Sequence, residues 1–311
     1  MALTSPVLNS NNKGVVNQQL LDEVVFGQYN DPFSDPYMAS VRDEMVMRQK
    51  STDTSAHTTA NFAGPGLFSA KTESHRPEQD SVQIDQYKTT LVNTFAKDVD
   101  LSMEFFEDEE FDIVVEMLRE LGLMARITSE IQGMGIYRDN ATTNDGVGLI
   151  SNSHETINGD TVDNRVGSAL SPDSLNDAIT LLGEQQNQRG VVIYRNPRCL
   201  LTPYALFKDA VEQVDSELLP NTADNNINVV MSRYGIEAKR SSYLGAAQGG
   251  NDTYWWLLAD RHTVTRIDRK GLETDLVNPE FTDGLNYRYR ANYREAFTAD
   301  SYEGIVGYIG A

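Results

Sequence analysis

The chain has 311 residues, 40% of them hydrophobic, which allows one large domain or two smaller ones and excludes a chain that is disordered throughout. Its 46 acidic and 26 basic residues give a formal net charge of −20, which argues against an outer surface that binds nucleic acid, because such a surface needs basic clusters. The same charge suits a protein that stays soluble at high concentration and repels nearby DNA.

The one cysteine, Cys199, excludes an intrachain disulfide and allows folding in the cytosol. It lies in the apolar run 198–201, which predicts a buried strand and a structural thiol. No apolar run approaches the roughly 20 residues of a membrane helix. Residues 1–20 are polar and lack the pattern of a secretory signal.

The first hundred residues are mostly polar. Residues 1–33 lack periodicity, which predicts an extended arm. Residues 36–50 are predicted to form a short helix, because Pro36 stands near its start and apolar residues follow at a spacing of four. Residues 51–80 form a long polar stretch followed by the apolar positions of a strand, so we expect a protruding β-hairpin or loop there.

The strongest local signal is a long amphipathic helix over residues 108–131. Acidic residues crowd its first turn, as the helix dipole prefers. At about 1.5 Å per residue this helix would be roughly 36 Å long. The run Gly133-Met134-Gly135 is expected to end it. Its apolar residues recur at helical spacing: Phe111, Val114, Val115, Leu118, Leu121 and Ala125.

The remaining chain mixes helices and strands without a repeat or a regular strand–helix–strand order, which indicates an α+β fold. One helix is predicted to begin at Ser171-Pro172 and to end at Gly190, and another to begin at Thr202-Pro203. Strands are predicted over residues 191–194, at 200–201, and over 227–231, 255–258, 263–267 and 287–297.

The histidines show no catalytic or metal-binding pattern. There are four of them, and no His-x-x-x-His or Cys-x-x-Cys pair exists, so a zinc site is not expected. His154 stands between Ser153 and Glu155, but a catalytic triad needs residues that converge from separate elements. We expect His154 to be a hydrogen-bonded turn residue. The other three are His57, His75 and His262.

Three further clusters each allow a functional and a structural interpretation. The acidic run 107–110 could bind a divalent cation, but its place at a helix start explains it. Trp255-Trp256 could be a sugar or base platform, and an apolar strand buried at a subunit or domain interface is favoured. The alternating arginines and tyrosines of 287–290 fit a base-stacking strip or an inter-subunit ion-pair strip. Glycine-rich runs at 64–66 and 146–148 lack the lysine–serine tail of a phosphate loop. We therefore expect no catalytic, cofactor-binding or metal site.

The order of these segments resembles that of the major capsid proteins of tailed bacteriophages, which share the HK97-like fold. Residues 101–111 resemble the approach to the family's long spine helix, and 145–154 the turn and strand that follow it. Residues 197–206 resemble its strand-to-helix step, and 255–260 a late aromatic strand before Asp.

The resemblance implies an α+β, non-enzymatic shell subunit that forms pentamers and hexamers of an icosahedral virion head around double-stranded DNA, assembled in the host cytoplasm. It implies portal and scaffold proteins as partners, and a decoration protein as a further one, with no cofactor and no membrane. Its segments would be an N-terminal arm with a short helix (1–50), an extended loop or E-loop (51–100), a peripheral domain with the spine helix (101–165), an axial domain (166–280) and strands that return to the peripheral domain (281–311).

Two alternatives remain. An encapsulin, the shell protein of a bacterial nanocompartment, has the same fold, but the long polar arm favours a phage protein. A soluble α+β hydrolase would need a nucleophile and a base, for which four scattered histidines and one thiol are poor material.

Some members of the resembled family join a lysine of the extended loop to an asparagine of a neighbouring subunit. The reaction needs a neutral amine in an apolar pocket. Lys71 has solvated neighbours, Lys50 and Lys97 lie at the ends of the loop, and Lys88 on a predicted strand is the better candidate. Since most loop lysines are solvated, we expect no crosslink.

Overall fold

The computed structural model describes most of the chain, and its residues group into two compact units. The first unit comprises residues 1–32, 92–129 and 268–295, and the second unit comprises 33–91, 130–267 and 296–311. Each unit thus combines segments that are distant in the sequence. The predicted acidic run 107–110 and the start of the predicted arm lie outside the described residues, which are 18–30, 35–102, 111–217, 228–277 and 286–310.

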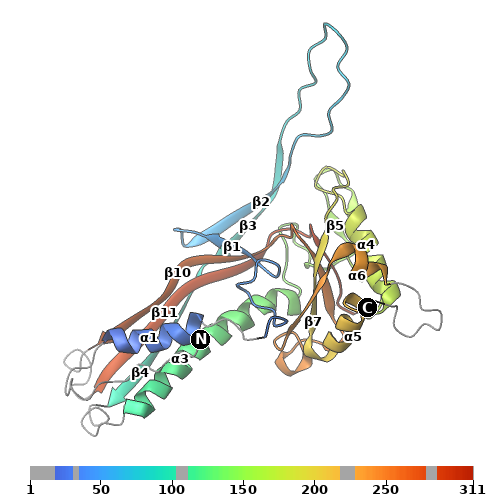
Figure 1. Ribbon diagram of the computed structural model, residues 1–311. Helices are drawn as coiled ribbons and strands as arrows, with labels where there is room; N and C mark the ends of the chain where they lie inside the picture. The colour runs from blue at the N-terminus through green and yellow to red at the C-terminus, as the bar shows by residue number, and fades with distance from the viewer. Residues whose placement is uncertain (1–17, 31–34, 103–110, 218–227, 278–285, 311) are drawn as a thin grey trace. The chain divides into compact units, whose positions relative to one another are not determined.

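In the first unit two helices cover a β-sheet (Figure 1). The helices are α1 (Gln18–Asn30) and the beginning of α3 (Phe111–Arg138). The strands of this unit are β4 (Asn93–Ser102) and most of β10 (Val264–Val277) and β11 (Asn286–Ala299), in the order β10-β11-β4. The short strand β1 (Arg48–Ser51) belongs to the second unit. β11 and β4 are antiparallel. The core of this unit contains Leu21, Val25, Leu101, Leu118, Leu121, Tyr289 and Tyr293.

The extended conformation predicted for residues 1–33 is wrong over α1. Leu21, Val25 and Tyr29 recur at a spacing of four and are buried on the first unit. The helix α1 passes close to α3 at Gly122, where a Cβ atom would lie 2.4 Å from the Val25 carbonyl oxygen. Polar neighbours hide this short apolar stripe in the sequence, and packing against α3 stabilises it as a helix.

The short helix predicted over residues 36–50 is also wrong, since turns precede β1 there. Met38 forms a parallel bridge with Arg240, and the Ala39 N–H donates to the Arg240 carbonyl at 2.8 Å. Val41 and Met47 are fully buried in the second unit. The segment satisfies its backbone at a strand edge and buries its apolar side chains from turns, so a helix is not needed.

The long helix is confirmed, but it does not end at Gly133. α3 continues through Gly133 and Gly135 to Arg138. A Cβ atom at position 133 would lie 2.3 Å from Val41 Cγ1 and 2.8 Å from Phe297 Cε1. The glycine therefore permits close packing within the second unit, and a helix interior tolerates it at a modest cost.

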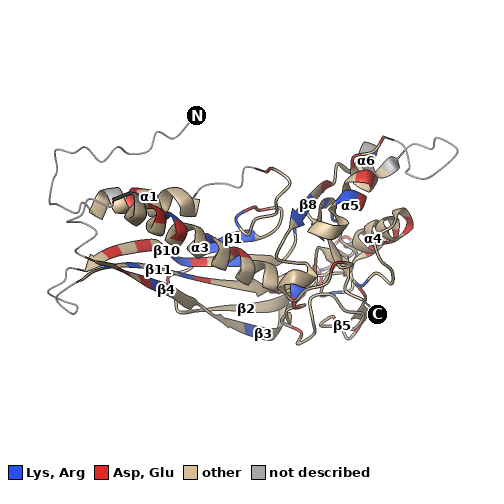
Figure 2. Ribbon diagram, turned by 90° about the horizontal axis from the view of Figure 1, so that it is seen from below, with Lys and Arg blue, Asp and Glu red and all other residues tan. Residues whose placement is uncertain are grey.

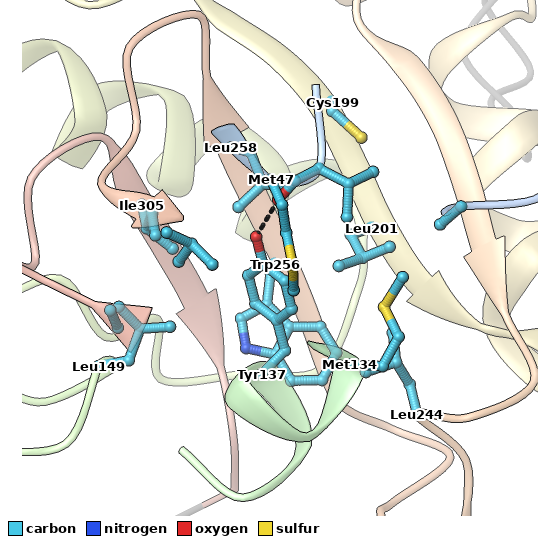
Figure 3. Close-up of a cluster of buried hydrophobic side chains, with 14 of the residues drawn as sticks. Met47, Met134, Tyr137, Leu149, Cys199, Leu201, Leu244, Trp256, Leu258 and Ile305 are labelled. Atoms are coloured by element: carbon cyan, nitrogen blue, oxygen red, sulfur yellow. Dashed lines mark hydrogen bonds between the residues drawn. The ribbon is translucent and has the colours of Figure 1, made fainter. Parts of the chain in front are cut away.

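The second unit is built on a four-stranded sheet with a core on each face. The strand order is β12-β9-β7-β8, with β7 parallel to β8 and antiparallel to β9. One core contains Tyr137, Leu201 and Trp256 (Figure 3), where the Tyr137 hydroxyl donates to the Val46 carbonyl. The other contains Leu200 and Trp255 together with residues of the helices α4 (Pro172–Glu184) and α5 (Phe207–Val214). The strands are β7 (Pro197–Pro203), β8 (Glu237–Ser241), β9 (Trp255–Ala259) and β12 (Ile305–Tyr308).

The sequence-based boundaries in this unit hold only in part. α4 (Pro172–Glu184) is capped by Ser171 as expected, but it ends before Gly190. Residues 191–194 form no strand, and the strand predicted over 227–231 is wrong, because α6 (Val229–Tyr234) begins there with Asn228 as its N-cap. The other elements are η1 (Tyr204–Leu206), α5 (Phe207–Val214), η2 (Ala246–Gln248), β5 (His154–Glu155), β6 (Thr161–Val162), and the hairpin strands β2 (Ala56–Ala63) and β3 (Gln83–Leu91).

None of the helices in the described part of the chain has both the length and the hydropathy of a membrane span.

Candidate functional site

The β2–β3 hairpin of the second unit contains one extra residue that changes which side chains share a face. The strands are antiparallel, with Ala60 opposite Tyr87 and Asn61 opposite Asp85. Gln86 is the extra residue of this bulge, and its φ of 54° lies in the left-handed region. In a regular strand Ile84 would share a face with Lys88. The bulge places Ile84 on the face of Tyr87 instead.

The outer face of the hairpin, as we name the face that carries Tyr87, is apolar and open to solvent. Phe62, Ile84, Tyr87 and Leu91 lie on it, and each is more than half exposed, with Tyr87 and Leu91 at 68%. The loop between the strands extends away from the rest of the second unit (Figure 1) and carries the fully exposed Phe68. A contiguous apolar surface of this kind marks an interaction site.

The opposite, inner face is polar and is hydrogen-bonded to its own unit. Thr59 Oγ1 donates to Asp300 Oδ1 at 3.1 Å, and Thr90 Oγ1 donates to Thr298 Oγ1 at 3.2 Å. Asn144 Nδ2 donates to Asn61 Oδ1 at 3.3 Å. The hairpin is therefore inverted relative to an ordinary surface hairpin, because its polar face meets the protein and its apolar face meets water.

Lys88 anchors the base of this inner face. Its ammonium donates to the Ala299 carbonyl at 3.0 Å and to the Thr142 carbonyl at 2.5 Å. Burial lowers the pKa of Lys88, and the nearby carboxylates of Asp300 and Asp145 oppose that shift. The sequence singled out Lys88 as the better candidate for a crosslink, and the structure places its amine on carbonyls of its own unit. Lys71 is exposed, as expected.

His154 stabilises the turn that receives Lys88. Its side chain is fully buried, with Nδ1 2.6 Å from Asp145 Oδ2 and its ring stacked on Tyr302. Burial alone would raise the pKa of Asp145, but hydrogen bonds from His154 and the Thr143 hydroxyl outweigh it and lower that pKa. The Ser153 hydroxyl instead lies 3.0 Å from that of Ser151. The arrangement is the predicted hydrogen-bonded turn, and Ser153 is no nucleophile for His154.

The other histidines do not join this site. His262 is buried, and burial lowers its pKa to about 4. His57 lies 3.4 Å from the Lys50 amine, and His75 is exposed in the loop. Within the described residues, no group of three or more His, Cys, Asp or Glu side chains is placed to hold a metal ion.

The arginines of the arginine–tyrosine strand form ion pairs within the chain. Arg288 Nε lies 2.7 Å from Asp100 Oδ1, and Arg290 Nη2 lies 2.9 Å from Asp98 Oδ2, so these ion pairs join β11 to β4 of the same chain. Acidic and basic positions accordingly lie side by side on these strands (Figure 2). Tyr289 is buried, and its hydroxyl lies 2.6 Å from Asp22 Oδ1, so it offers no face to a base.

Trp255 and Trp256 are fully buried in strand β9, so the strand is buried as expected and offers no exposed platform for a sugar or base. The two cores of the second unit bury them, so the expected subunit or domain interface is not what covers this strand. Cys199 is fully buried in β7, as expected. Burial raises the pKa of its thiol to about 12, so the thiol stays protonated and inert.

The first unit carries a second open apolar surface. A groove of about 390 Å³ lies beside α3 and the strand β4. Phe95, Leu121, Met124 and Tyr293 contribute to its walls. This groove lies in the first unit, whereas the outer face of the hairpin belongs to the second.

Sequence reasoning missed the bulge and the role of Arg189, which contacts the hairpin where β2 ends and before β3 begins. Gln86 itself is not one of the residue types that commonly adopt a positive φ, such as glycine or asparagine, so the sequence does not mark it as the bulge residue. Arg189 precedes Gly190, which was expected only to end a helix. Its contacts with Gly64 and Asp80 are more than 100 positions away in the sequence, and no local pattern encodes them.

Comparisons with known proteins agree on family and fold. A family model described as phage capsid protein matches residues 85–307. The fold is similar to that of a virus-like particle protein from Pyrococcus furiosus (9% identity, 93% of this chain and 97% of that one, TM-score 0.57). It is also similar to the capsid of Myoviridae phage XM1 (13% identity, 90% and 95%, TM-score 0.52) and to the SrpI encapsulin of Synechococcus elongatus PCC 7942 (12% identity, 92% and 94%, TM-score 0.53). No curated protein matches the sequence.

Proposed function

This chain belongs to the phage capsid protein family, and we propose that it is the major head protein of a tailed bacteriophage, which assembles as pentamers and hexamers into an icosahedral shell around double-stranded DNA. The family and the HK97-like α+β fold make it a shell-forming structural protein and not an enzyme. Many copies of the same chain are therefore its principal partners.

The inverted hairpin is the observation that carries this proposal. Phe62, Ile84, Tyr87 and Leu91 face outward while polar side chains hold the hairpin to its own unit. Burying an apolar side chain of this size contributes about 1.5–3 kcal/mol. The outer face would gain this free energy when it lies on a neighbouring copy, and closed symmetry repeats the contact throughout a shell.

The finer assignments belong to the same proposal. We take the segment around the hairpin as the E-loop, residues 101–165 as the peripheral domain and 166–280 as the axial domain. Portal and scaffold proteins, and a decoration protein, are proposed further partners, and the virion head is the proposed location. The net charge of −20 fits a wall that encloses DNA without adhering to it.

An encapsulin-type shell is the second candidate, because the fold likeness extends to an encapsulin. The two candidates differ in what their shells enclose. A phage head encloses double-stranded DNA, whereas a nanocompartment would enclose protein. Nuclease-protected DNA of genome length in particles that contain this chain supports the phage assignment, and DNA-free particles from the native host would favour the encapsulin.

The role of the outer face is tested by two matched double variants. Ile84→Ser with Tyr87→Ser removes apolar surface, whereas Ile84→Val with Tyr87→Phe keeps it. Sedimentation and electron microscopy should show particles for the parent and for the Val/Phe variant, and only small species for the Ser/Ser variant. Normal particles from the Ser/Ser variant would refute docking through this face, and a parent protein that stays monomeric at high concentration would refute a shell.

A further inference from the structure

A single arginine joins the two sides of the hairpin where its strands end. Arg189 Nε donates to the Gly64 carbonyl at 2.9 Å, directly after β2. Its Nη2 donates to the Ser81 carbonyl at 2.6 Å and to Asp80 Oδ1 at 3.0 Å, just before β3. We call these residues, 64–66 and 80–81, the neck of the hairpin. One guanidinium therefore binds both sides of the neck.

Asp80 also joins the two sides of the neck, through hydrogen bonds from backbone N–H groups of the neck itself. Its Oδ2 accepts from the Gly66 N–H at 2.6 Å, and its Oδ1 accepts from the Ser81 N–H at 2.7 Å. These two backbone hydrogen bonds, together with the one from Arg189, lower the pKa of Asp80. The planar guanidinium can donate hydrogen bonds to several acceptors at once, whereas a lysine ammonium at this position would act as a point charge.

Arg189 is itself held in place by a tight turn. Asn187 Oδ1 accepts from the backbone N–H groups of Arg189 at 2.9 Å and Val191 at 3.0 Å. Asn158 Nδ2 donates to the Arg189 carbonyl at 2.9 Å. Gly190 has a φ of 74°, which allows the turn to close without strain. The position of the guanidinium is therefore defined by the turn at residues 187–191 and by Asn158, and not by the loop that it binds.

Beyond the neck the loop makes no such attachment among the described contacts. All of residues 67–79 are exposed, and the hydrogen bonds described there are local, such as the one from the His75 N–H to the Thr72 carbonyl at 3.2 Å. Leu67 is 79% exposed and Phe68 is fully exposed. The neck is thus the last point at which this segment is tied to its own unit.

We propose that Arg189 is a positioning residue for assembly, which closes the neck and thereby sets the direction in which residues 67–79 leave the molecule. This inference rests on the proposed function, in which the hairpin docks on a second copy. A loop that starts from a fixed neck loses less conformational entropy on docking than one that starts from an open neck. Leu67 and Phe68 are the first residues beyond the neck, and the closed neck would direct their side chains toward the second copy.

The first test measures the direction of the loop in full-length protein kept unassembled by dilution. Spin labels on Ser69→Cys and Asp260→Cys, two exposed positions of the second unit, report the distance from the loop to the unit. The buried Cys199 takes no label. Arg189→Ala should broaden the distance distribution, Arg189→Lys should broaden it less, and added guanidinium should narrow it again for Arg189→Ala. Arg198→Ala, which removes an exposed arginine from β7, is the control.

The second test compares assembly of the unlabelled variants. Amide exchange at Gly66 should be at least about fivefold faster in Arg189→Ala, at an unchanged melting temperature, and particles should form about tenfold more slowly than for Arg198→Ala. An unchanged distance distribution overturns the proposal. A broadened distribution with normal assembly kinetics overturns it too, and leaves the proposed function intact because particles form. If parent and control form no particles, the proposed function fails, and so does the positioning role that depends on it.

Discussion

At the scale of single residues, the hairpin base depends on a chain of charged and polar groups. Lys88 binds the carbonyls of Thr142 and Ala299. The turn that contains Thr142 is held by Asp145, which pairs with the fully buried His154. Removal of one partner of a buried hydrogen bond leaves the other partner without compensation for its desolvation. Substitutions at Asp145 or His154 are therefore expected to disturb the attachment of the hairpin although neither residue belongs to it.

Asp145→Asn is expected to lower the free energy of unfolding by about 3 kcal/mol, because it leaves His154 without its carboxylate partner in a buried site. The folded-state pKa of Asp145 lies below its unfolded value, so its stabilising effect is complete above about pH 4 and is lost as the pH falls through the folded-state pKa. Urea unfolding of parent and variant should give a difference that shrinks below about pH 4. A difference that grows on acidification would contradict this assignment.

At the scale of elements, two of the three glycines of α3, Gly133 and Gly135, have different surroundings. Gly133 faces Val41 and Phe297 at distances that leave no room for a methyl group. For a Cβ at Gly135 the nearest atom is Asp139 Oδ2, at 3.5 Å. The same substitution therefore has opposite expected effects two residues apart.

Gly133→Ala is expected to destabilise the protein by about 1–3 kcal/mol, because the new methyl group overpacks the second unit. Gly135→Ala should be neutral or stabilising by up to about 1 kcal/mol, because alanine favours the helix. Thermal unfolding of the two variants and of the parent measures both changes in stability. Equal effects of the two substitutions would show that helix propensity, and not packing, governs these positions.

A second pair of variants tests which face of α3 is buried in the first unit. Leu118 is fully buried, whereas Ile113 is 47% exposed. Leu118→Asp places an unpaired charge in the core and should cost about 4–5 kcal/mol, enough to prevent soluble folding. Ile113→Asp should fold like the parent. Soluble expression and circular dichroism decide between them, and a folded, assembling Leu118→Asp variant would contradict the assigned face.

At the scale of the whole molecule, stability of the assembled shell is expected to rest on non-covalent contacts. The loop lysine with the least solvated amine, Lys88, already donates to two carbonyls of its own unit. An amine held in this way is not free to attack an asparagine of a neighbour.

Mature particles boiled in denaturant should therefore give a single band of subunit mass on an electrophoresis gel. Apolar docking of the outer face would be lost under these conditions, because detergent and heat remove the contacts that hold copies together. A ladder of subunit multiples that survives boiling would show a covalent link. Lys88→Arg, which keeps the charge but cannot form the amide, would then identify the lysine.

The sequence alone determined those features whose signals are local. The apolar spacing of residues 111–125 predicted the start of α3, Ser171 predicted the cap of α4, and the apolar runs at Cys199 and Trp255-Trp256 predicted buried strands. The order of these elements also indicated the α+β class and resembled the family that the comparisons show. Such signals can be read from the sequence because they depend on neighbours within a few positions.

The tertiary structure decided what depends on distant partners. Residues 38–47 form turns because β8 and a buried core accept them, and α3 passes Gly133 because Val41 and Phe297 pack there. The inverted hairpin follows from the Gln86 bulge, and its closed neck follows from Arg189. Residues far apart in the chain meet in each case, and their free energy of contact overrides or adds to the local preference that the sequence expresses.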